Sequence, residues 1–394
     1  MMSSPYPENA CTTFFSWITG IVVLSLVGTC FAGNGSGYLI VSANDESVVY
    51  RDNRMVFLDE PGAGNLTVLD FKSFPPSART IKNVPVTVIG PPTCVALVPG
   101  RELAIVTSAM VTRKVDGVYR HEVDARVALV DLRGSGRVID LFETGLQPSG
   151  VTVTPDGKAA WLANRAEGTV SVMMIRGEKL IEEARIEVAG PADSLSHVEI
   201  SPNGKYGVAT LTEGGQILVF RVQEDGIPGV IARLDCGGKP YAARFLPDGS
   251  GFFVADIERD RVAYYRFDAG DVKLEIEFAV GRIPEGIDIR PDGGWIAVSC
   301  FDGGNLTDES HARFGEPSRI YFLRKHEGCF VPAGNVEIEG TPQFAVFSGD
   351  GQYIAVSNTG KQKLSFLRRS GGGFVPTENT HSLPGEPVAA IGSR

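Results

Sequence analysis

The chain has 394 residues, of which 43% are hydrophobic and 21% charged, and its formal net charge is −10. This acidic balance, without a basic stripe, argues against binding to nucleic acid or to an anionic membrane surface. The 47 glycines and 24 prolines indicate many turns between short strands. A bundle of helices is therefore disfavoured.

The N-terminus contains a nearly charge-free apolar run at residues 14–31 that ends in small residues, as at a signal-peptidase site. We expect cleavage before Gly33, so that residues 1–32 are a signal peptide and residues 33–394 are one domain that is periplasmic or secreted. The run is preceded by Glu8 and by no Lys or Arg, which is unusual for a secretory signal. The alternatives are a mis-assigned start or an uncleaved membrane anchor, since about 18 apolar residues just span a bilayer.

The rest of the chain repeats a hairpin motif, in which an apolar strand, a Pro-Asp-Gly-like turn and a second apolar strand follow one another. The turn glycines lie 47, 45, 44 and 58 residues apart, at Gly157, Gly204, Gly249, Gly293 and Gly351. A more divergent copy starts at Val95. A third and a fourth strand follow in each unit, and this period is typical of the four-stranded blades of a β-propeller.

The two ends of the chain carry complementary fragments of one further unit. Glu386–Ile391 resembles a first strand with no hairpin behind it, and the segment from Tyr38 resembles a second strand with no first strand before it. We therefore predict an all-β fold, a seven-bladed β-propeller of four-stranded antiparallel blades, closed by pairing the N- and C-terminal strands. Two insertions, 108–124 and 301–317, fall between second and third strands and are expected to be surface loops.

Several of these units resemble known repeat families. The runs Gly145–Ile175 and Ser196–Val222 resemble YVTN-type repeats, and Phe245–Asp268 is similar to repeats of the lactonase-like, or 6-phosphogluconolactonase-like, seven-bladed propellers. The resemblance covers nearly everything after residue 38 and implies the propeller architecture. For activity it implies lactone hydrolases and lactonising enzymes, but also exported propellers with no assigned reaction. The paired histidines that such repeats often have are absent, because residues 239–242 read Lys-Pro-Tyr-Ala.

Aligned first strands place a column of varied side chains at the entrance of the central tunnel. The members of this column are Thr93, Ser149, Ser196, Tyr241, Glu285, Gln343 and Val388. The candidate catalytic residues are His197 or Glu285, as the general base for attack of water on an ester carbonyl, with Tyr241 and Arg244 binding the oxyanion or a substrate carboxylate. Two alternatives remain, namely ligand binding without catalysis, and hydrogen bonding to channel water and backbone only.

Three strand positions beyond the entrance column, Glu199, Arg244 and Asp288 occupy matching places in consecutive units. An acid, a base and an acid in series predict ion pairs between blades, because buried charges require partners.

The second insertion concentrates oxygen-bearing side chains that could bind a hard cation such as calcium. They are Asp302, Asn305, Asp308 and Glu309, followed by His311. Their spacing matches no established calcium loop, so a solvated loop is favoured and no metal is predicted.

Four cysteines lie outside the predicted leader, at positions 94, 236, 300 and 329, and are expected to be buried free thiols or to form one disulfide. Without a Cys-x-x-Cys motif, neither covalent haem nor a zinc ribbon is supported, and no cofactor is predicted.

The leading functional hypothesis is an exported binding or scaffolding propeller, which binds a small molecule or a protein at the tunnel mouth and is a monomer. The alternative is a lactone hydrolase or lactonising enzyme acting at the same place. The propeller is strongly indicated by the repeat, whereas the catalytic residues match no complete motif.

Overall fold

The recurrent Pro-Asp-Gly-type turns join the first two strands of each repeat. The computed structural model describes residues 38–224, 226–268 and 271–393. At the turn of residues 154–159, the N–H of Gly157 donates to the carbonyl of Thr154 at 2.8 Å, and Gly157 has a φ of 69°. The matching glycines 204, 249, 293 and 351 have φ angles of 68°, 69°, 71° and 63°. This left-handed conformation favours glycine, which explains why the motif recurs at the same point of each hairpin.

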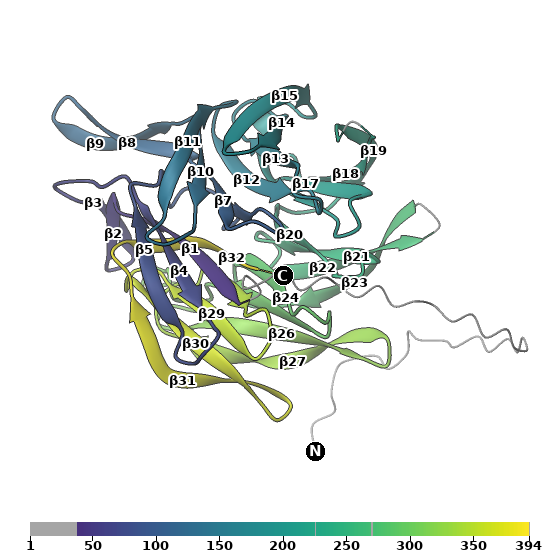
Figure 1. The fold of residues 1–394 in the computed structure, drawn as a ribbon. Coiled ribbons are helices and arrows are strands. Elements are labelled where there is room, and N and C mark those ends of the chain that lie inside the picture. Colours follow the sequence, from purple (N-terminus) through teal and green to yellow (C-terminus); the bar gives the residue numbers. More distant parts are fainter. Residues whose placement is uncertain (1–37, 225, 269–270, 394) are drawn as a thin grey trace, which may run out of the picture. The chain divides into compact units, whose positions relative to one another are not determined.

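Seven four-stranded antiparallel sheets form the blades, as predicted (Figure 1). From the axis outward, blade 1 contains β6 (Val95–Leu97), β7 (Leu103–Thr107), β10 (Arg126–Asp131) and β11 (Arg137–Glu143); blade 2 contains β12 (Pro148–Val153), β13 (Ala159–Asn164), β14 (Thr169–Arg176) and β15 (Lys179–Glu187); blade 3 contains β16 (Leu195–Ile200), β17 (Tyr206–Leu211), β18 (Gln216–Val222) and β19 (Pro228–Asp235). Blade 4 contains β20 (Pro240–Phe245), β21 (Gly251–Asp256), β22 (Arg261–Asp268) and β23 (Asp271–Ala279); blade 5 contains β24 (Pro284–Ile289), β25 (Trp295–Cys300), β26 (Ser318–His326) and β27 (Cys329–Ile338); blade 6 contains β28 (Ala345–Phe347), β29 (Tyr353–Asn358), β30 (Lys363–Ser370) and β31 (Gly373–Ser382). A short 3-10 helix, η1 (Pro191–Asp193), precedes β16.

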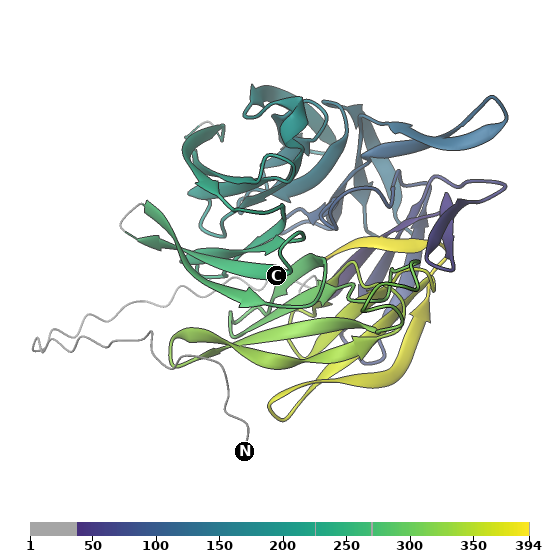
Figure 2. The ribbon, with the colours of Figure 1, turned by 180° about the vertical axis from the view of Figure 1, so that it is seen from behind.

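Blade 7 is assembled from both ends of the chain, which confirms the predicted closure. Its order is β32 (Glu386–Gly392), β1 (Leu39–Asp45), β4 (Asn65–Asp70) and β5 (Ser77–Lys82). The register between β1 and β32 runs from Ile40 opposite Gly392 to Asp45 opposite Glu386, with one bulge. The first strand of each blade contacts those of its two neighbours all around the ring, so the blades surround one axis (Figure 2). We call the pairing of β1 with β32 the seam.

The hydrophobic core lies between neighbouring blades. The second strands are its most buried part, and every residue of β13, β21 and β25 is buried. Between blades 2 and 3, for example, the fully buried rings of Trp161 and Phe220 meet edge to face with centroids 5.8 Å apart. Each sheet must therefore be covered on both faces, and only a closed ring provides this for all seven.

Hydroxyl side chains on second strands also link one blade to the next. Thr107 donates to the carbonyl of Ser149 at 2.7 Å, and Thr210 donates to the carbonyl of Tyr241 at 2.6 Å. Ser299 makes the same contact with the carbonyl of Gln343 at 2.9 Å. These bonds satisfy carbonyls of first strands that would otherwise be buried without a partner.

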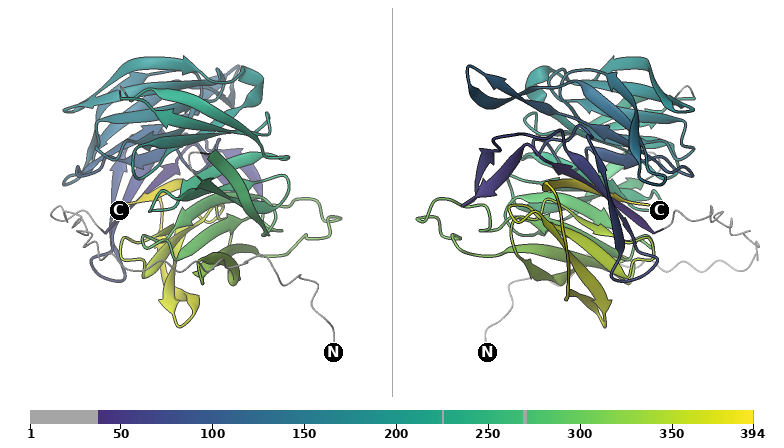
Figure 3. Two further views of the ribbon diagram at one scale, coloured as in Figure 1. Left: turned by 90° about the vertical axis from the view of Figure 1, so that its right-hand side faces the viewer. Right: turned by 60° about the vertical axis from the view of Figure 1, so that its left-hand side comes forward.

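Three insertions join second to third strands on the same side of the ring. The segment 108–124 is a hairpin rather than an irregular loop, formed by β8 (Met110–Val115) and β9 (Val118–Val123). A second hairpin, β2 (Val48–Arg51) and β3 (Arg54–Phe57), was not foreseen. Both turns have two central residues with positive φ, as type I′ hairpin turns require, and Figure 3 shows both hairpins projecting to one side. The third insertion is the segment 301–317 of blade 5.

The predicted leader, residues 1–32, lies outside the described residues. Within the described part of the chain, no helix has the length and the apolar character that a membrane crossing needs.

Removal of the seam strand should unfold blade 7 rather than shorten a tail. Deletion of residues 386–394 leaves β1 without its partner and exposes the faces of blades 6 and 1, so we expect the thermal unfolding midpoint to fall by more than about 10 °C or the cooperative transition to disappear. The measurement is thermal unfolding followed by circular dichroism.

A circular permutant provides the control for this deletion. Ser393 donates its N–H to the carbonyl of Leu39 at 2.8 Å, so the ends of the propeller lie side by side and a short linker can join them. Opening the chain instead between Gly371 and Gly372, in an exposed turn, keeps the seam. The permutant should therefore stay close to the wild type in stability, and an equal loss in both variants would contradict the role of the seam.

Candidate functional site

One end of the ring axis gathers polar side chains from several blades. At this end the first strands begin and the second strands end, and we call it the axial mouth. The entrance positions of successive first strands, predicted to form one column, are held by Thr93, Ser149, Ser196, Tyr241, Glu285, Gln343 and Val388. Four of the strands that present them carry a bulge near this point, which lets the chain turn into the mouth.

Below the mouth, the central tunnel narrows to a cavity that has room for about one water molecule. Its lining comes from five blades and includes Thr93, Arg244, Gly286 and Phe344. The space open to the centre of a water-sized sphere is about 10 Å³, which is close to the minimum for one water. A larger ligand therefore has to sit at the mouth.

Tyr241 and Glu285 occupy the entrance positions of β20 and β24, on adjacent blades. Burial raises the pKa of the Glu285 carboxyl to about 8, while the Arg165 guanidinium acts in the opposite direction. Burial, reinforced by the charge of Glu285, raises the pKa of the Tyr241 hydroxyl well above its ordinary value. Glu285 is partly exposed, and no hydrogen bond or ion pair joins its carboxyl to another described side chain. A carboxyl of this kind is protonated for most of the time at neutral pH.

Arg165 is a mouth residue that the sequence analysis missed. It follows β13 directly, and its Nε donates to the hydroxyl of Ser194 in the next blade at 2.6 Å. Its charge acts on both Tyr241 and Glu285. The signal that could have found it is positional, because the residue that follows each second strand faces the same mouth as the entrance column.

Two further mouth residues hold polar atoms without partners. The hydroxyl of Thr93 and the side-chain carbonyl of Gln343 are buried, and neither has a hydrogen-bond partner among the described residues. Buried polar atoms are nearly always paired, so each such case points to a water or a ligand. Together with Tyr241, Glu285 and Arg165, they form a set of hydrogen-bonding groups drawn from five blades.

His197, also predicted at the mouth, is buried between blades, and Arg244 lines the axial cavity below the mouth. His197 is 1% exposed, and its Nε2 lies 3.1 Å from the carbonyl oxygen of Ala243. Gly150 makes room for this ring, since a Cβ atom there would come within 2.8 Å of the Cα of His197. His197 and Arg244 thus both contact Glu199, at 3.6 Å and 3.1 Å, whereas the charge of Glu285 acts on Tyr241.

Arg244 is the centre of the predicted chain of ion pairs. Its Nη1 lies 3.1 Å from Glu199 and its Nε lies 3.5 Å from Asp288. Asp288 also accepts the N–H of Phe347 at 2.8 Å, so the contacts run through blades 3 to 6. Burial alone would raise the pKa of Glu199, but the charges of Arg244 and His197 hold it at about 2. The prediction of inter-blade pairing is confirmed.

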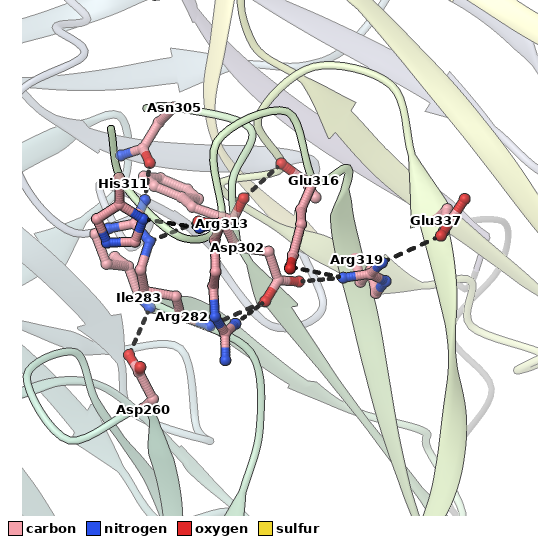
Figure 4. Close-up of polar contacts among 12 residues, drawn as sticks. Asp260, Arg282, Ile283, Asp302, Asn305, His311, Arg313, Glu316, Arg319 and Glu337 are labelled. Atoms are coloured by element: carbon pink, nitrogen blue, oxygen red, sulfur yellow. Dashed lines mark hydrogen bonds and ion pairs between the residues drawn. The ribbon is translucent and has the colours of Figure 1, made fainter. Parts of the chain in front are cut away.

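Two of the candidate cation ligands of the second insertion, Asp302 and Asn305, contact arginine side chains (Figure 4). Asp302 is fully buried, and its carboxylate lies 2.9 Å from Arg313 and 3.7 Å from Arg319. Arg282 donates to the side chain of Asn305. The expectation of a solvated loop is therefore wrong for Asp302, and the described residues contain no group of three or more His, Cys, Asp or Glu suited to a metal ion. No disulfide joins the four cysteines outside the leader.

The elevated pKa of Glu285 predicts a pH-dependent stability. The folded protein holds this proton more tightly than the unfolded chain, because the pKa rises from an ordinary 4.5 to about 8. The resulting stabilisation is present at low pH and is lost as the pH rises through about 8. Glu285→Gln stays neutral, so its thermal midpoint should exceed that of the wild type by several degrees at about pH 9 and by little at about pH 5. A difference that is the same at both pH values would contradict the assignment.

The Asp302 contacts should determine the stability of the second insertion. Asp302→Ala leaves the guanidinium groups of Arg313 and Arg319 without their buried partner, and we expect a loss of about 1–3 kcal/mol in unfolding free energy. Asp308 is the matched control, since it is exposed in the same segment and its side chain accepts hydrogen bonds only from Ser310. Asp308→Ala should change stability by less than about 0.5 kcal/mol. Urea unfolding measures both, and equal losses would contradict the special role of Asp302.

Comparisons with known proteins agree with this architecture. Residues 134–290 match the family model of the lactonase 7-bladed beta-propeller. No curated protein sequence matches the chain. Among solved structures, a candidate 6-phosphogluconolactonase from Bacteroides uniformis is 16% identical, with a TM-score of 0.68 over 90% of this chain and 98% of that one. The periplasmic gluconolactonase of Pseudomonas aeruginosa is also 16% identical, with a TM-score of 0.65 and the same coverage.

A propeller of quite different function is similar as well. The hydrazine synthase of Kuenenia stuttgartiensis is 19% identical, with a TM-score of 0.56 over 71% of this chain and 76% of that one. Likeness at these identities shows the fold alone. In its repeat, in the matched segment and in its closed ring, the chain resembles the lactonase-like seven-bladed β-propellers.

Proposed function

We propose that the chain binds a small polyhydroxylated carboxylic acid, or the lactone of such an acid, at the axial mouth. The proposal is carried by the unpartnered side-chain oxygens of Thr93 and Gln343 at two entrance positions, and by the charge effects that link Arg165, Tyr241 and Glu285 at the same end of the ring. A concave site with a few convergent polar groups and a strongly shifted pKa is the typical setting of a ligand site.

The chemistry of the mouth residues suits such a ligand. Arg165 offers a charged donor for a carboxylate or for the carbonyl of a lactone. Glu285 in its protonated form and Tyr241 each add a hydroxyl donor, and Thr93 and Gln343 add acceptors for hydroxyl groups. A ligand rich in hydroxyls would satisfy all of them at once.

Hydrolysis of a lactone is the second candidate function, and the pKa of about 8 at Glu285 favours it. In its ionised form Glu285 would take a proton from water while the water oxygen attacks the ester carbonyl. The ring C–O bond then breaks, and the leaving oxygen takes the proton back. Arg165 and Tyr241 would stabilise the oxyanion. A base with this pKa makes the rate rise with pH up to about 8.

The setting of this activity remains part of the proposal. We propose that the chain works outside the cytoplasm, because its N-terminal run is apolar. We also propose that it is a monomer and that it binds no nucleic acid. The Pseudomonas aeruginosa protein similar in fold is described as a periplasmic gluconolactonase, which makes gluconate and D-glucono-δ-lactone suitable probes.

Calorimetric titration with gluconate tests the binding proposal. Arg165→Met and Glu285→Gln should each weaken gluconate binding by about tenfold or more, as expected for loss of a charge-assisted contact or of a hydrogen-bond donor. Arg176→Met is the control, because Arg176 is 65% exposed on blade 2 and pairs only weakly with Glu183 at 3.9 Å.

The control should bind gluconate as the wild type does. Hydrolysis of D-glucono-δ-lactone above the spontaneous rate, lost in Glu285→Gln, would add catalysis to binding. A wild type that binds neither probe, or that binds gluconate no better than Arg165→Met, would contradict the proposed function.

A further inference from the structure

We propose that Tyr50 determines which ligands the mouth accepts, as a wall that the β2–β3 hairpin holds over the sector of blade 6. The inference rests on the proposed function, because it names a selectivity residue of the same site. It concerns a segment that lies outside the repeat and outside the part matched by the family model, residues 134–290.

The hairpin has one inward and one outward face. Tyr50 pairs with Met55 across the two strands, and Val48 pairs with Phe57. Side chains alternate along a strand, so these four lie on one face, and three of them, Val48, Tyr50 and Phe57, pack against the core of the seam. The turn at Asp52 and Asn53, with φ angles of 48° and 59°, keeps the two strands in this register.

Tyr50 is fixed from below by the seam strand β32. Its N–H donates to one carboxylate oxygen of Glu386 at 3.2 Å, and the other oxygen accepts the N–H of Gly360 at 2.7 Å. Gly360 follows β29 of blade 6, and a Cβ atom placed on it would lie 3.5 Å from the Cβ of Tyr50. One buried carboxylate thus holds the base of the hairpin against the rim of blade 6.

The tip of the hairpin is fixed on the far side. The Nδ2 of Asn53 donates to the carbonyl of Leu306 at 3.0 Å, within the insertion of blade 5. The hairpin therefore extends from blade 7, where it originates, across blade 6 to blade 5. Gln343 of blade 6, whose side-chain carbonyl has no partner among the described residues, is the mouth residue in this sector.

The Tyr50 side chain packs against the core cluster that contains Val388, the entrance residue of blade 7. Burial, followed by the charges of Glu386, Asp45 and Glu285, raises the pKa of the Tyr50 hydroxyl to about 12. At neutral pH the hydroxyl remains protonated and can donate a hydrogen bond to a ligand.

The β8–β9 hairpin supports the same structure from the side of blade 1. Thr112 donates to Ser47 at 2.9 Å, and the ring of His121 meets that of Phe57 with centroids 4.9 Å apart. By contrast, only four residues separate the second and third strands in each of blades 2, 3, 4 and 6. The rim is thus raised along blades 5, 7 and 1 and low over blades 2 to 4. A ligand with bulk directed at the raised side should be rejected.

Three sugar acids test this inference by titration calorimetry. Gluconate is the compact probe, and lactobionate and melibionate carry a galactosyl group on different hydroxyls of gluconate. We expect the wild type to bind gluconate at least about tenfold more tightly than one of the two larger acids. Tyr50→Ala should reduce this preference by about tenfold, whereas Tyr50→Phe, which keeps the ring, should retain it.

Matched variants separate selectivity from folding. Arg54→Ala alters an exposed side chain on the outward face of the same hairpin and should keep the preference of the wild type. Asn53→Ala removes the bond to Leu306 without touching the mouth and should reduce the preference in part. If Tyr50→Ala unfolds, Tyr50→Leu retains the apolar contact with the seam and should show the same loss of preference.

The outcomes distinguish this inference from the proposed function. Equal preference in the wild type and in the folded Tyr50→Ala or Tyr50→Leu variant would overturn the role of Tyr50, and so would a wild type that binds all three acids equally. If Arg165→Met still loses gluconate in that case, the proposed function stands without the wall. Unchanged gluconate binding in Arg165→Met would instead contradict the proposed function itself.

Discussion

The pairing of β1 with β32 is the contact on which the rest of the structure depends. Each blade buries both faces against its neighbours, so an open ring would expose two apolar faces at once. The seam also builds the mouth, because its last pair, Asp45 opposite Glu386, holds the surrounding loops. Asp45 accepts the N–H groups of Ser47 and Val88, and Glu386 accepts those of Tyr50 and Gly360. Closure and the shape of the site therefore come from the same few hydrogen bonds.

Two glutamates near the axis show how a structural charge differs from a functional one. Glu199 contacts Arg244, and its pKa is held at about 2, whereas Glu285 has no bonded partner among the described side chains, and its pKa rises to about 8. Burial alone would raise the pKa of both carboxyls, so the cation in contact with Glu199 reverses the direction of its shift. The first arrangement ties blades together, and the second keeps a proton available at the mouth near neutral pH.

The insertions make the rim of this propeller less regular than its repeat alone would build it. The repeat builds seven similar blades with short connections, which leaves the rim uniform. The hairpins of blades 7 and 1 and the arginine-bound segment of blade 5 change only one side of that rim, and contacts such as Asn53 to Leu306 join them. Function on such scaffolds lies in loops of this kind, and the fold alone does not specify it.

The sequence by itself determined the architecture, because the turns and the alternation of apolar residues are local properties. The Pro-Asp-Gly-type glycines predicted the blades, the fragments at Tyr38 and Glu386 predicted the seam, and aligned columns predicted the pairing of Glu199, Arg244 and Asp288. Only the tertiary structure decided the composition of the mouth. A shift of one position along a strand turns a side chain to the other face of the sheet. His197 therefore lies between blades, whereas the entrance column, one position earlier, faces the axis. Arg165 comes from a strand end, and Tyr50 comes from a hairpin outside the repeat. Arg282, which contacts the second insertion, comes from a separate segment before β24 and meets it only in the folded protein.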